Sequence, residues 1–302
     1  MLLFSLVTHY QPDAQSFITD PTRWGLIKNK ATDARACLAF SLFRAEGIEP
    51  ILIKGLAAAR FYPDGEFRNS IDMDIAVAAH DFDLATRVVE SEAAKGLAID
   101  LHRELRHLDT LEWSDLVTNS QLLELEKGTI RVLRPEDHLR ILCVHWLTDG
   151  GANKDRLWDI YHAVANRPPD FDWDRFLNVV DRKRRRWLTC TVGLAHRYLD
   201  LDLAGTPLEQ DTKDIPNWLI KAVEKEWTSN TPFRPLFSSI HDSKLFIAQI
   251  KKRLPPNPIT ATVLLNGRFD ARTRIFYQIG SSFVRIVPSI VQITKNLFAR
   301  SK

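Results

Sequence analysis

Apolar residues recur through the first 134 residues at the spacings of both helices and strands. Residues 12–48 carry apolar side chains at helical spacing, and Gly47 ends the run. The apolar residues 50–53 predict a short strand, and Lys54-Gly55 predicts a tight turn into a helix that begins at Leu56. This part of the chain is therefore expected to run helix, strand, turn, helix.

Further along, apolar and polar residues alternate in three segments, with the period of two that is typical of a half-buried strand. A stretch with helical spacing separates the first two of them. The expected strands are 71–77, 97–102 and 129–133, and the intervening helix covers 81–95.

From residue 135 onward the pattern becomes helical. Pro135 opens a helix with Glu136 and Asp137 in its first turn, where the helix dipole favours acidic side chains. Several prolines break the last third of the chain into short pieces. The expected helices are 135–149, 155–165 and 174–198.

The pattern predicts an α+β protein with an N-terminal sheet and a mainly helical C-terminal part. We expect three domains: an α/β domain over 1–134, a helical domain over 135–205 packed on it, and a basic helical extension over 206–302. The composition, 45% hydrophobic and 26% charged with 12 Gly and 15 Pro, excludes a disordered or collagen-like chain.

Cysteine usage and the first residues bear on the compartment. Cys37, Cys143 and Cys190 are too far apart and too few for a disulfide framework or a cysteine-rich zinc site. The first residues carry no Lys or Arg before their short apolar run, so they do not resemble a secretory signal. We therefore expect a cytoplasmic protein.

Charge is distributed unevenly. Residues 244–302 hold 11 Lys/Arg and one acid, Asp270, so this segment carries +10 within a chain of net charge +3. The segment is compatible with binding a polyanion such as nucleic acid, or with a solvated helical face. The run of five basic residues at 182–186 has the same two interpretations, of which the solvated face is preferred.

The apolar stretch 275–293 is about as long as a membrane span of roughly 20 residues. It contains Arg285 and Pro288, however, and a central arginine opposes insertion. No transmembrane segment is therefore expected. A buried or interfacial helix is favoured, with contact at a membrane surface as the lesser alternative.

Candidate chemistry lies on the polar faces of two expected strands. Asp72 and Asp74 are two residues apart, which places their carboxylates about 6–7 Å apart on one face. Such a pair needs a cation, and oxygen ligands suit Mg²⁺. Asp100 of the next strand would complete a site for two metal ions about 3.5–4 Å apart, the geometry of phosphoryl transfer. The alternative is that these acids lie on solvated edge strands.

The surrounding residues carry a wider resemblance. In order along the chain, they are Ile53-Lys54-Gly55, Tyr62-Pro63, Arg68, Asp72-Met73-Asp74, Asp100-Leu101-His102, Arg134-Pro135-Glu136-Asp137, His145 and Trp158-Asp159-Ile160. With these elements, residues 25–200 resemble the DNA polymerase beta-type nucleotidyltransferase superfamily, and more closely its uncharacterised bacterial branch. Leu56 departs from the superfamily pattern, which has Gly or Ser after the turn glycine. Residues 206–302 carry no such resemblance.

The resemblance implies a mixed sheet with flanking helices and a metal-dependent enzyme that moves an NMP from an NTP to an acceptor hydroxyl, releasing pyrophosphate. Mg²⁺, or Mn²⁺ in its place, would be held by Asp72, Asp74 and Asp100, and Asp100 could also accept the hydroxyl proton. The nucleotide, with ATP the expected one, would contact four residues: Lys54, Gly55, Arg68 and His102.

Other functions stay open. The acceptor could be a small molecule, a peptide, a protein or an RNA end. A catalytically inactive module that binds nucleotide for regulation or interaction is the main alternative. A nucleic-acid-binding accessory protein that uses the basic last third is the other. The chain lacks the sequence motifs of P-loop NTPases, zincins and α/β-hydrolases.

Overall fold

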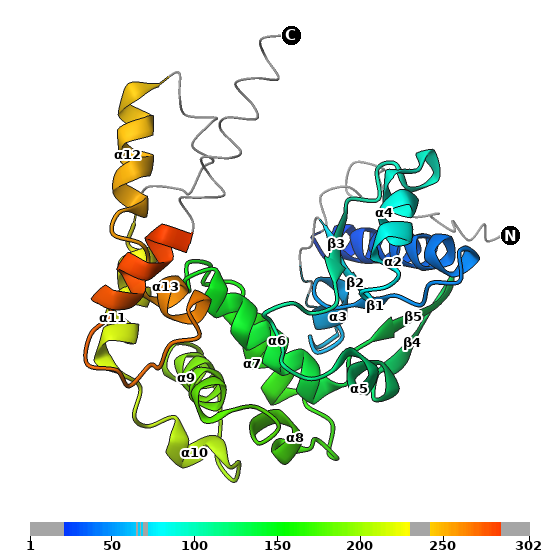
Figure 1. The fold of residues 1–302 in the computed structure, drawn as a ribbon. Coiled ribbons are helices and arrows are strands. Elements are labelled where there is room, and N and C mark those ends of the chain that lie inside the picture. Colours follow the sequence, from blue (N-terminus) through cyan, green and yellow to red (C-terminus); the bar gives the residue numbers. More distant parts are fainter. Residues whose placement is uncertain (1–20, 65, 67, 69–71, 230–241, 285–302) are drawn as a thin grey trace, which may run out of the picture. The chain divides into compact units, whose positions relative to one another are not determined.

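The computed structural model describes residues 21–64, 66, 68, 72–229 and 242–284 (Figure 1). The expected starts of the first helix at residue 12 and of the second strand at Ile71 lie outside these residues. The chain forms two compact units, one of residues 1–104 with 121–132 and one of 105–120 with 133–302. Both helices and a sheet are present, in agreement with the α+β class. The division into three domains stays a prediction.

A five-stranded mixed sheet forms the centre of the first unit. Its strands lie in the order β3-β2-β1-β5-β4. The pairs β2–β3 and β1–β5 are parallel, whereas β1–β2 and β4–β5 are antiparallel. The strands are β1 (Ile51–Leu52), β2 (Met73–Val77), β3 (Ile99–Arg103), β4 (Gln121–Leu125) and β5 (Gly128–Val132).

Strand β2 departs from the expected half-buried pattern. All five of its residues are buried, including Asp74, so the expectation of one solvated face is wrong for this strand. The reason is that both faces of β2 are covered: Met73, Ile75 and Val77 lie in the hydrophobic core, and Lys54 and His102 contact Asp74 on the other face. Strand β3 is at the edge of the sheet, and its residues are half-buried or exposed.

Helices α2 and α4 pack with the sheet of the first unit. Phe40 and Phe43 of α2 join Ile75 and Val77 of β2 in one hydrophobic core. Burial of such side chains contributes roughly 1.5–3 kcal/mol each. Met73, Ile75 and Val77 point into this core, so the even-numbered residues of β2 point to the opposite face of the sheet. The helical elements of this unit are α2 (Pro21–Ala45), α3 (Leu56–Ala59), α4 (Phe82–Glu90) and η1 (Glu92–Ala94).

The second unit is helical and is arranged around α6. Twelve of the fourteen residues of α6 are buried, because α7, α8, α9 and α13 all pack against it. The elements are α5 (Trp113–Thr118), α6 (Pro135–Thr148), α7 (Leu157–Ala165), α8 (Trp173–Leu177), α9 (Arg182–Leu199), α10 (Leu208–Asp211), α11 (Asn217–Trp227), α12 (Ser243–Arg253) and α13 (Pro258–Leu264).

The helix expected over 174–198 is in fact two helices. Helix α8 ends at Leu177, and α9 begins at Arg182. The Asp181 carboxylate accepts a hydrogen bond from the Arg184 backbone N–H at 2.8 Å, which caps the new helix. The periodicity alone did not reveal this break.

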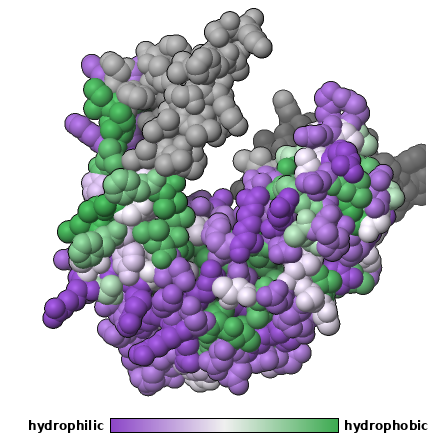
Figure 2. Space-filling model, viewed as in Figure 1, coloured by the Kyte–Doolittle hydropathy of each residue, from purple (hydrophilic) through white to green (hydrophobic). Residues whose placement is uncertain are grey.

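Residues 275–284 form a further helix whose large apolar side chains are exposed. Figure 2 shows hydrophobic side chains gathered where Figure 1 draws this helix in red. The rest of the apolar stretch, 285–293, lies outside the described residues. Among the helices that the structure describes, none has the length and apolar character needed to cross a membrane.

Candidate metal and nucleotide site

The parallel pairing of β2 and β3 brings together acidic residues that are far apart in sequence. Asp74 is paired with Asp100 in the ladder, so both side chains leave the sheet on the same face. His102 follows Asp100 by two residues and shares that face. The structure thus places Asp100 beside Asp74, and the metal-binding role of the two aspartates stays a prediction.

Among the residues that the structure describes, one group of three side chains is close enough to hold a metal ion. It consists of Asp74, Asp100 and His102, and one ligand atom of each lies within 4.8 Å of the others. His102 Nε2 is 3.1 Å from Asp74 Oδ1 and 3.3 Å from Asp100 Oδ2. The imidazole thus links the two carboxylates.

Lys54 reaches the same group from the turn after β1. Its ammonium forms an ion pair with Asp74 Oδ1, the oxygen that also contacts His102. The antiparallel pairing of β1 and β2 places it there, since the Ile53 N–H donates to the Asp74 carbonyl at 3.0 Å. Lys54 was expected to contact phosphate, and here it neutralises an acid.

The electrostatics of Asp74 follow from these contacts. Burial by itself would raise the pKa of this carboxyl. The hydrogen bond from His102 and the charge of Lys54 more than offset that effect and lower the pKa from 3.8 to about 2. Asp74 is therefore a buried carboxylate that stays charged, whereas the Asp100 side chain is 57% exposed.

Gly55 forms the turn that leads from β1 to α3. Its backbone has φ 64° and ψ −120°, a conformation that residues with a Cβ rarely adopt. The Gly55 carbonyl accepts from the N–H groups of Ala58 and Ala59, which starts the helix. Helix α3 is a single turn of four residues, so its dipole at the turn is small.

Two further predicted site residues lie before β2. Asp72 is exposed and immediately precedes the strand, and it is not part of the three-residue group. Arg68 is half-buried. Residues 67 and 69–71 beside them are outside the described part of the chain. Their expected roles, metal binding for Asp72 and phosphate binding for Arg68, stay predictions.

The donor atoms of the group fit a divalent cation. Two carboxylates suit Mg²⁺ or Mn²⁺, and an imidazole nitrogen is either a further ligand or a hydrogen-bond donor beside the ion. A dication at Asp74 Oδ1 would take the place that the Lys54 ammonium now holds. A bound dication together with Lys54 would thus place positive charge beside β3, the edge strand of the sheet.

Comparison with protein families shows to which family the chain belongs. The family model described as uncharacterised nucleotidyltransferase matches residues 27–200, more than half of the chain. The chain belongs to this nucleotidyltransferase family. Comparisons with curated proteins and with solved structures give no match. The matched region contains Lys54, Asp74, Asp100 and His102.

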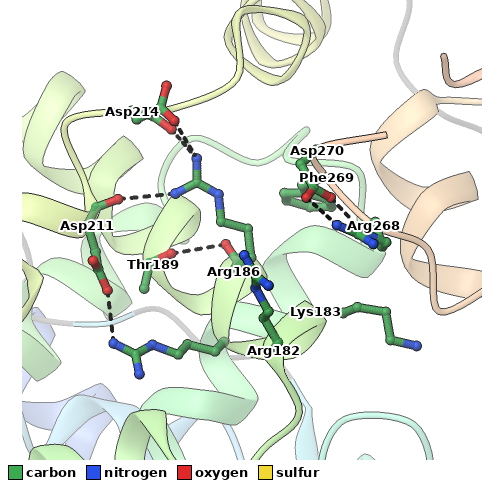
Figure 3. A pocket seen from close by; sticks show the side chains of 10 residues that line it. Arg182, Lys183, Arg186, Thr189, Asp211, Asp214, Arg268, Phe269 and Asp270 are labelled. Atoms are coloured by element: carbon green, nitrogen blue, oxygen red, sulfur yellow. Dashed lines mark hydrogen bonds and ion pairs between the residues drawn. The ribbon is translucent and has the colours of Figure 1, made fainter. Parts of the chain in front are cut away.

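The match also includes the basic run 182–186 at the start of α9. Four residues of this run, all except Arg184, line a cavity of about 500 Å³. Asp211 and Asp214 line it as well, as do residues 268–270 (Figure 3). Arg185 pairs with Asp211 at 3.1 Å and Arg186 with Asp214 at 3.4 Å. Arg184 is buried, and its Nη2 donates to the His107 carbonyl at 2.8 Å. The prediction of a solvated face is therefore wrong for Arg184. Arg185 and Arg186 are accessible but form ion pairs within the protein.

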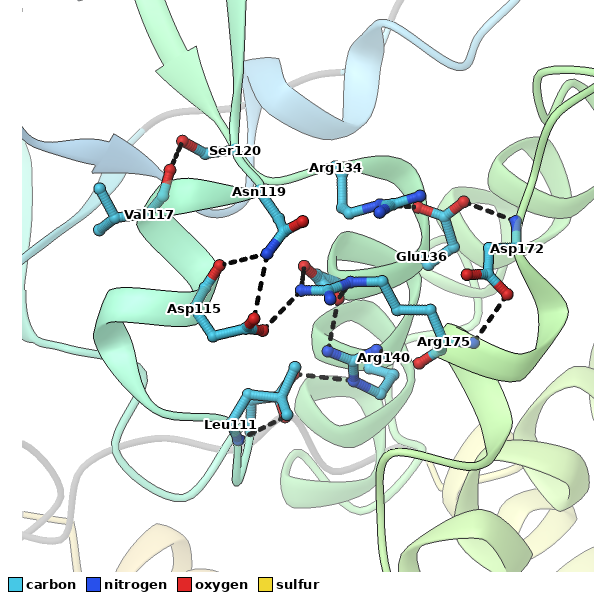
Figure 4. A network of polar contacts seen from close by, with 12 residues as sticks. Leu111, Asp115, Val117, Asn119, Ser120, Arg134, Glu136, Arg140, Asp172 and Arg175 are labelled. Atoms are coloured by element: carbon cyan, nitrogen blue, oxygen red, sulfur yellow. Dashed lines mark hydrogen bonds and ion pairs between the residues drawn. The ribbon is translucent and has the colours of Figure 1, made fainter.

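The acids that open α6 also have structural partners (Figure 4). Asp137 accepts from Arg140 at 2.6 Å and from Arg175 at 2.8 Å. Arg140 also donates to Asp109 at 2.9 Å, and Arg175 to Asp115 at 2.8 Å. Asp137 and Arg140 are buried, so this network ties α6 to α8 and to residues 109–115. Specific ion pairs, more than the helix dipole, explain the acid at position 137.

Two contacts of the site were not predicted from the sequence. The alternation along the strand places His102 on the face of Asp100, but its contact with Asp74 depends on the pairing of β2 and β3. The Lys54–Asp74 ion pair depends on how β1 and β2 pair.

Proposed function

We propose that the protein is a metal-dependent nucleotidyltransferase that moves an NMP from an NTP to a hydroxyl of an acceptor and releases pyrophosphate. The observation that carries this proposal is the pairing of Asp74 with Asp100 across β2 and β3 in a member of a nucleotidyltransferase family. The proposal includes membership of the DNA polymerase beta-type superfamily, with ATP as the nucleotide.

Asp74 and Asp100 would hold the cation, Mg²⁺ or Mn²⁺, with Asp72 as a further ligand. The carboxylate oxygens of Asp74 and Asp100 lie close together, which supports this assignment. Asp72 is exposed and lies just before the same strand as Asp74. A bound divalent cation would neutralise charge on the phosphates and make the α-phosphorus more electrophilic. His102 keeps the two carboxylates oriented through its contacts with both.

The basic residues would bind the triphosphate. Once a cation neutralises Asp74, the Lys54 ammonium is free to contact a phosphate oxygen at the Gly55 turn. Arg68 is the second cation of the expected phosphate site. Both would stabilise the pyrophosphate as negative charge develops on it.

The chemical step is a displacement at phosphorus. The acceptor hydroxyl oxygen forms a bond to the α-phosphorus, and the bond from that phosphorus to the bridging oxygen of the β-phosphate breaks. The hydroxyl proton passes to the Asp100 carboxylate, which is exposed enough to meet an acceptor. The electron pair of the broken bond leaves with pyrophosphate.

A nucleotide-binding module without transferase activity is the second candidate. Leu56 after the turn glycine supplies no hydroxyl to phosphate, and α3 offers only one helical turn. Such a module would bind NTP and transfer nothing.

The test is incubation of the purified protein with α-³²P-ATP or γ-³²P-ATP and Mg²⁺ or Mn²⁺, with and without cell lysate as the source of acceptor. Asp74→Asn is the test variant, and Asp83→Asn, which removes an exposed acid of α4 in the same unit, is the matched control. We expect label from α-³²P-ATP alone to reach an acceptor with the wild type and with Asp83→Asn.

Transfer that persists in Asp74→Asn would contradict the assigned site. Transfer of the γ label would indicate a kinase. Binding of ATP without any transfer would favour the regulatory module. The molecule that carries the label identifies the acceptor as a small molecule, peptide, protein or RNA.

A further inference from the structure

The helix over residues 275–284 directs polar side chains toward the protein and apolar side chains outward. A helix that covers a protein core has the opposite arrangement. Ser281 is fully buried and its hydroxyl contacts the Gln278 carbonyl at 3.1 Å. The Gln278 amide donates to the Pro256 carbonyl at 2.7 Å, and the Tyr277 hydroxyl accepts from the Arg268 N–H at 3.2 Å. The inward face of the helix is thus anchored by polar side chains.

The outward face of the same helix is apolar. Phe276 is 76% exposed and Phe283 is 68% exposed. Ile275 and Ile279 precede Phe283 by eight and four residues, so they lie on the same side of the helix, and both are more than half exposed. Figure 2 shows this hydrophobic surface. A contiguous apolar face of this kind marks a binding surface, since single exposed residues are ordinary but clusters are not.

The charge around this face identifies the kind of partner. The sequence of residues 271–302 contains six basic residues and no acid. Of the two that the structure describes, Arg272 is exposed and Arg274 is buried. The wider segment 244–302 carries +10. An apolar helical face within a basic segment is the composition of helices that lie in the interface of an anionic membrane.

The same charge argues against a second copy of the chain as the partner. Two copies joined through this face would bring two segments of +10 together, and the repulsion would oppose dimerisation. An anionic lipid surface has the opposite charge and also accepts the phenylalanine and isoleucine side chains.

We propose that residues 275–284 form a membrane-surface helix, with Phe276, Ile279 and Phe283 entering the interface of an anionic bilayer and the exposed Arg272 before the helix contacting lipid phosphates. The helix lies on the surface and does not cross the bilayer. This function is independent of nucleotidyl transfer.

The test is flotation of the full-length protein with vesicles of phosphatidylcholine alone or with about 25 mol% phosphatidylglycerol added. The variant Phe276→Ser/Phe283→Ser removes two rings that are each more than two thirds exposed. The matched control Leu122→Ser removes an exposed apolar side chain of β4 in the other unit. A thermal unfolding curve equal to that of the wild type confirms that each variant is folded.

We expect the wild type and Leu122→Ser to float with the anionic vesicles, and raising NaCl from about 0.1 M to about 0.5 M to weaken this binding. The double phenylalanine variant should bind at least about tenfold more weakly, as loss of two aromatic anchors implies. Three results would overturn the proposal: no binding of the wild type to anionic vesicles, equal binding of the double variant, or a dimer that the double variant dissociates.

Discussion

Asp74 on β2 and Asp100 on β3 are direct partners in a parallel ladder, and the first is buried whereas the second is at the accessible edge of the sheet. Although burial raises the pKa of Asp74, the hydrogen bond from His102 and the charge of Lys54 keep its carboxyl in the charged form. The exposed member is available to a substrate. The proposed reaction needs a fixed metal ligand and a group that can exchange a proton. The buried Asp74 suits the first role and the exposed Asp100 the second.

Replacement of Asp100 should impair transfer more than folding. We expect Asp100→Asn to lower the rate of label transfer by about 100-fold or more, because it removes a metal ligand and the acceptor of the hydroxyl proton. Its free energy of unfolding should change by less than about 0.5 kcal/mol, since the side chain is largely exposed. Transfer kinetics and urea unfolding check both statements, and unchanged kinetics would exclude Asp100 from the reaction.

Lys54 and a divalent cation should compete for Asp74. Lys54→Met removes the ammonium from Asp74 Oδ1, so the affinity for Mn²⁺ without nucleotide should rise by about tenfold, or about 1.4 kcal/mol. Transfer from ATP should fall at the same time, because a phosphate contact is lost. Lys95→Met, on the exposed surface of the same unit, is the control. An unchanged Mn²⁺ affinity would show that Lys54 does not occupy the cation position.

The low pKa of Asp74 links stability to pH. The pKa is about 2 in the folded protein and near 3.8 when unfolded, so the ionised carboxyl stabilises the fold above pH 3.8 and this stabilisation is lost as the pH falls through 2. Between about pH 5 and pH 3 the wild type should lose about 1 kcal/mol more unfolding free energy than Asp74→Asn. Urea unfolding at the two pH values measures this difference. Parallel losses in both proteins would contradict the lowered pKa.

The buried ion network at α6 should dominate the stability of the second unit. Asp137→Asn leaves Arg140 and Arg175 with one carboxylate fewer in a buried setting, and we expect a loss of about 3–5 kcal/mol. Arg185→Met, which breaks an accessible pair with Asp211, should cost less than about 1 kcal/mol. Equal effects of the two substitutions on the urea midpoint would show that burial of the network contributes little.

Local periodicity was enough to predict the elements that carry the site. The alternation around Asp74 and around Asp100 indicated strands, and β2, β3 and β5 are present. The Lys54-Gly55 turn was also predicted, because a glycine stands between an expected strand and an expected helix, and its φ of 64° favours glycine. These features depend on residues that are close in sequence.

Features that depend on distant partners were not predicted. Strand β4 was missed because Leu122 places a large apolar side chain on its exposed face and obscures the alternation. The burial of Asp74 depends on the strand order, and the pairing of Arg185 and Arg186 depends on residues 211–214. Periodicity contains no information on any of these relationships.

Divalent cation binding by Asp74 and Asp100 is tested most directly by electron paramagnetic resonance of Mn²⁺, titrated into the protein with α,β-methylene-ATP present. We expect the wild type and Asp83→Asn to remove the free Mn²⁺ signal with equal affinity. The double variant Asp74→Asn/Asp100→Asn should bind at least about 100-fold more weakly, or about 3 kcal/mol. Binding of Mn²⁺ by the folded double variant with the affinity of the wild type would contradict a metal site at these two aspartates.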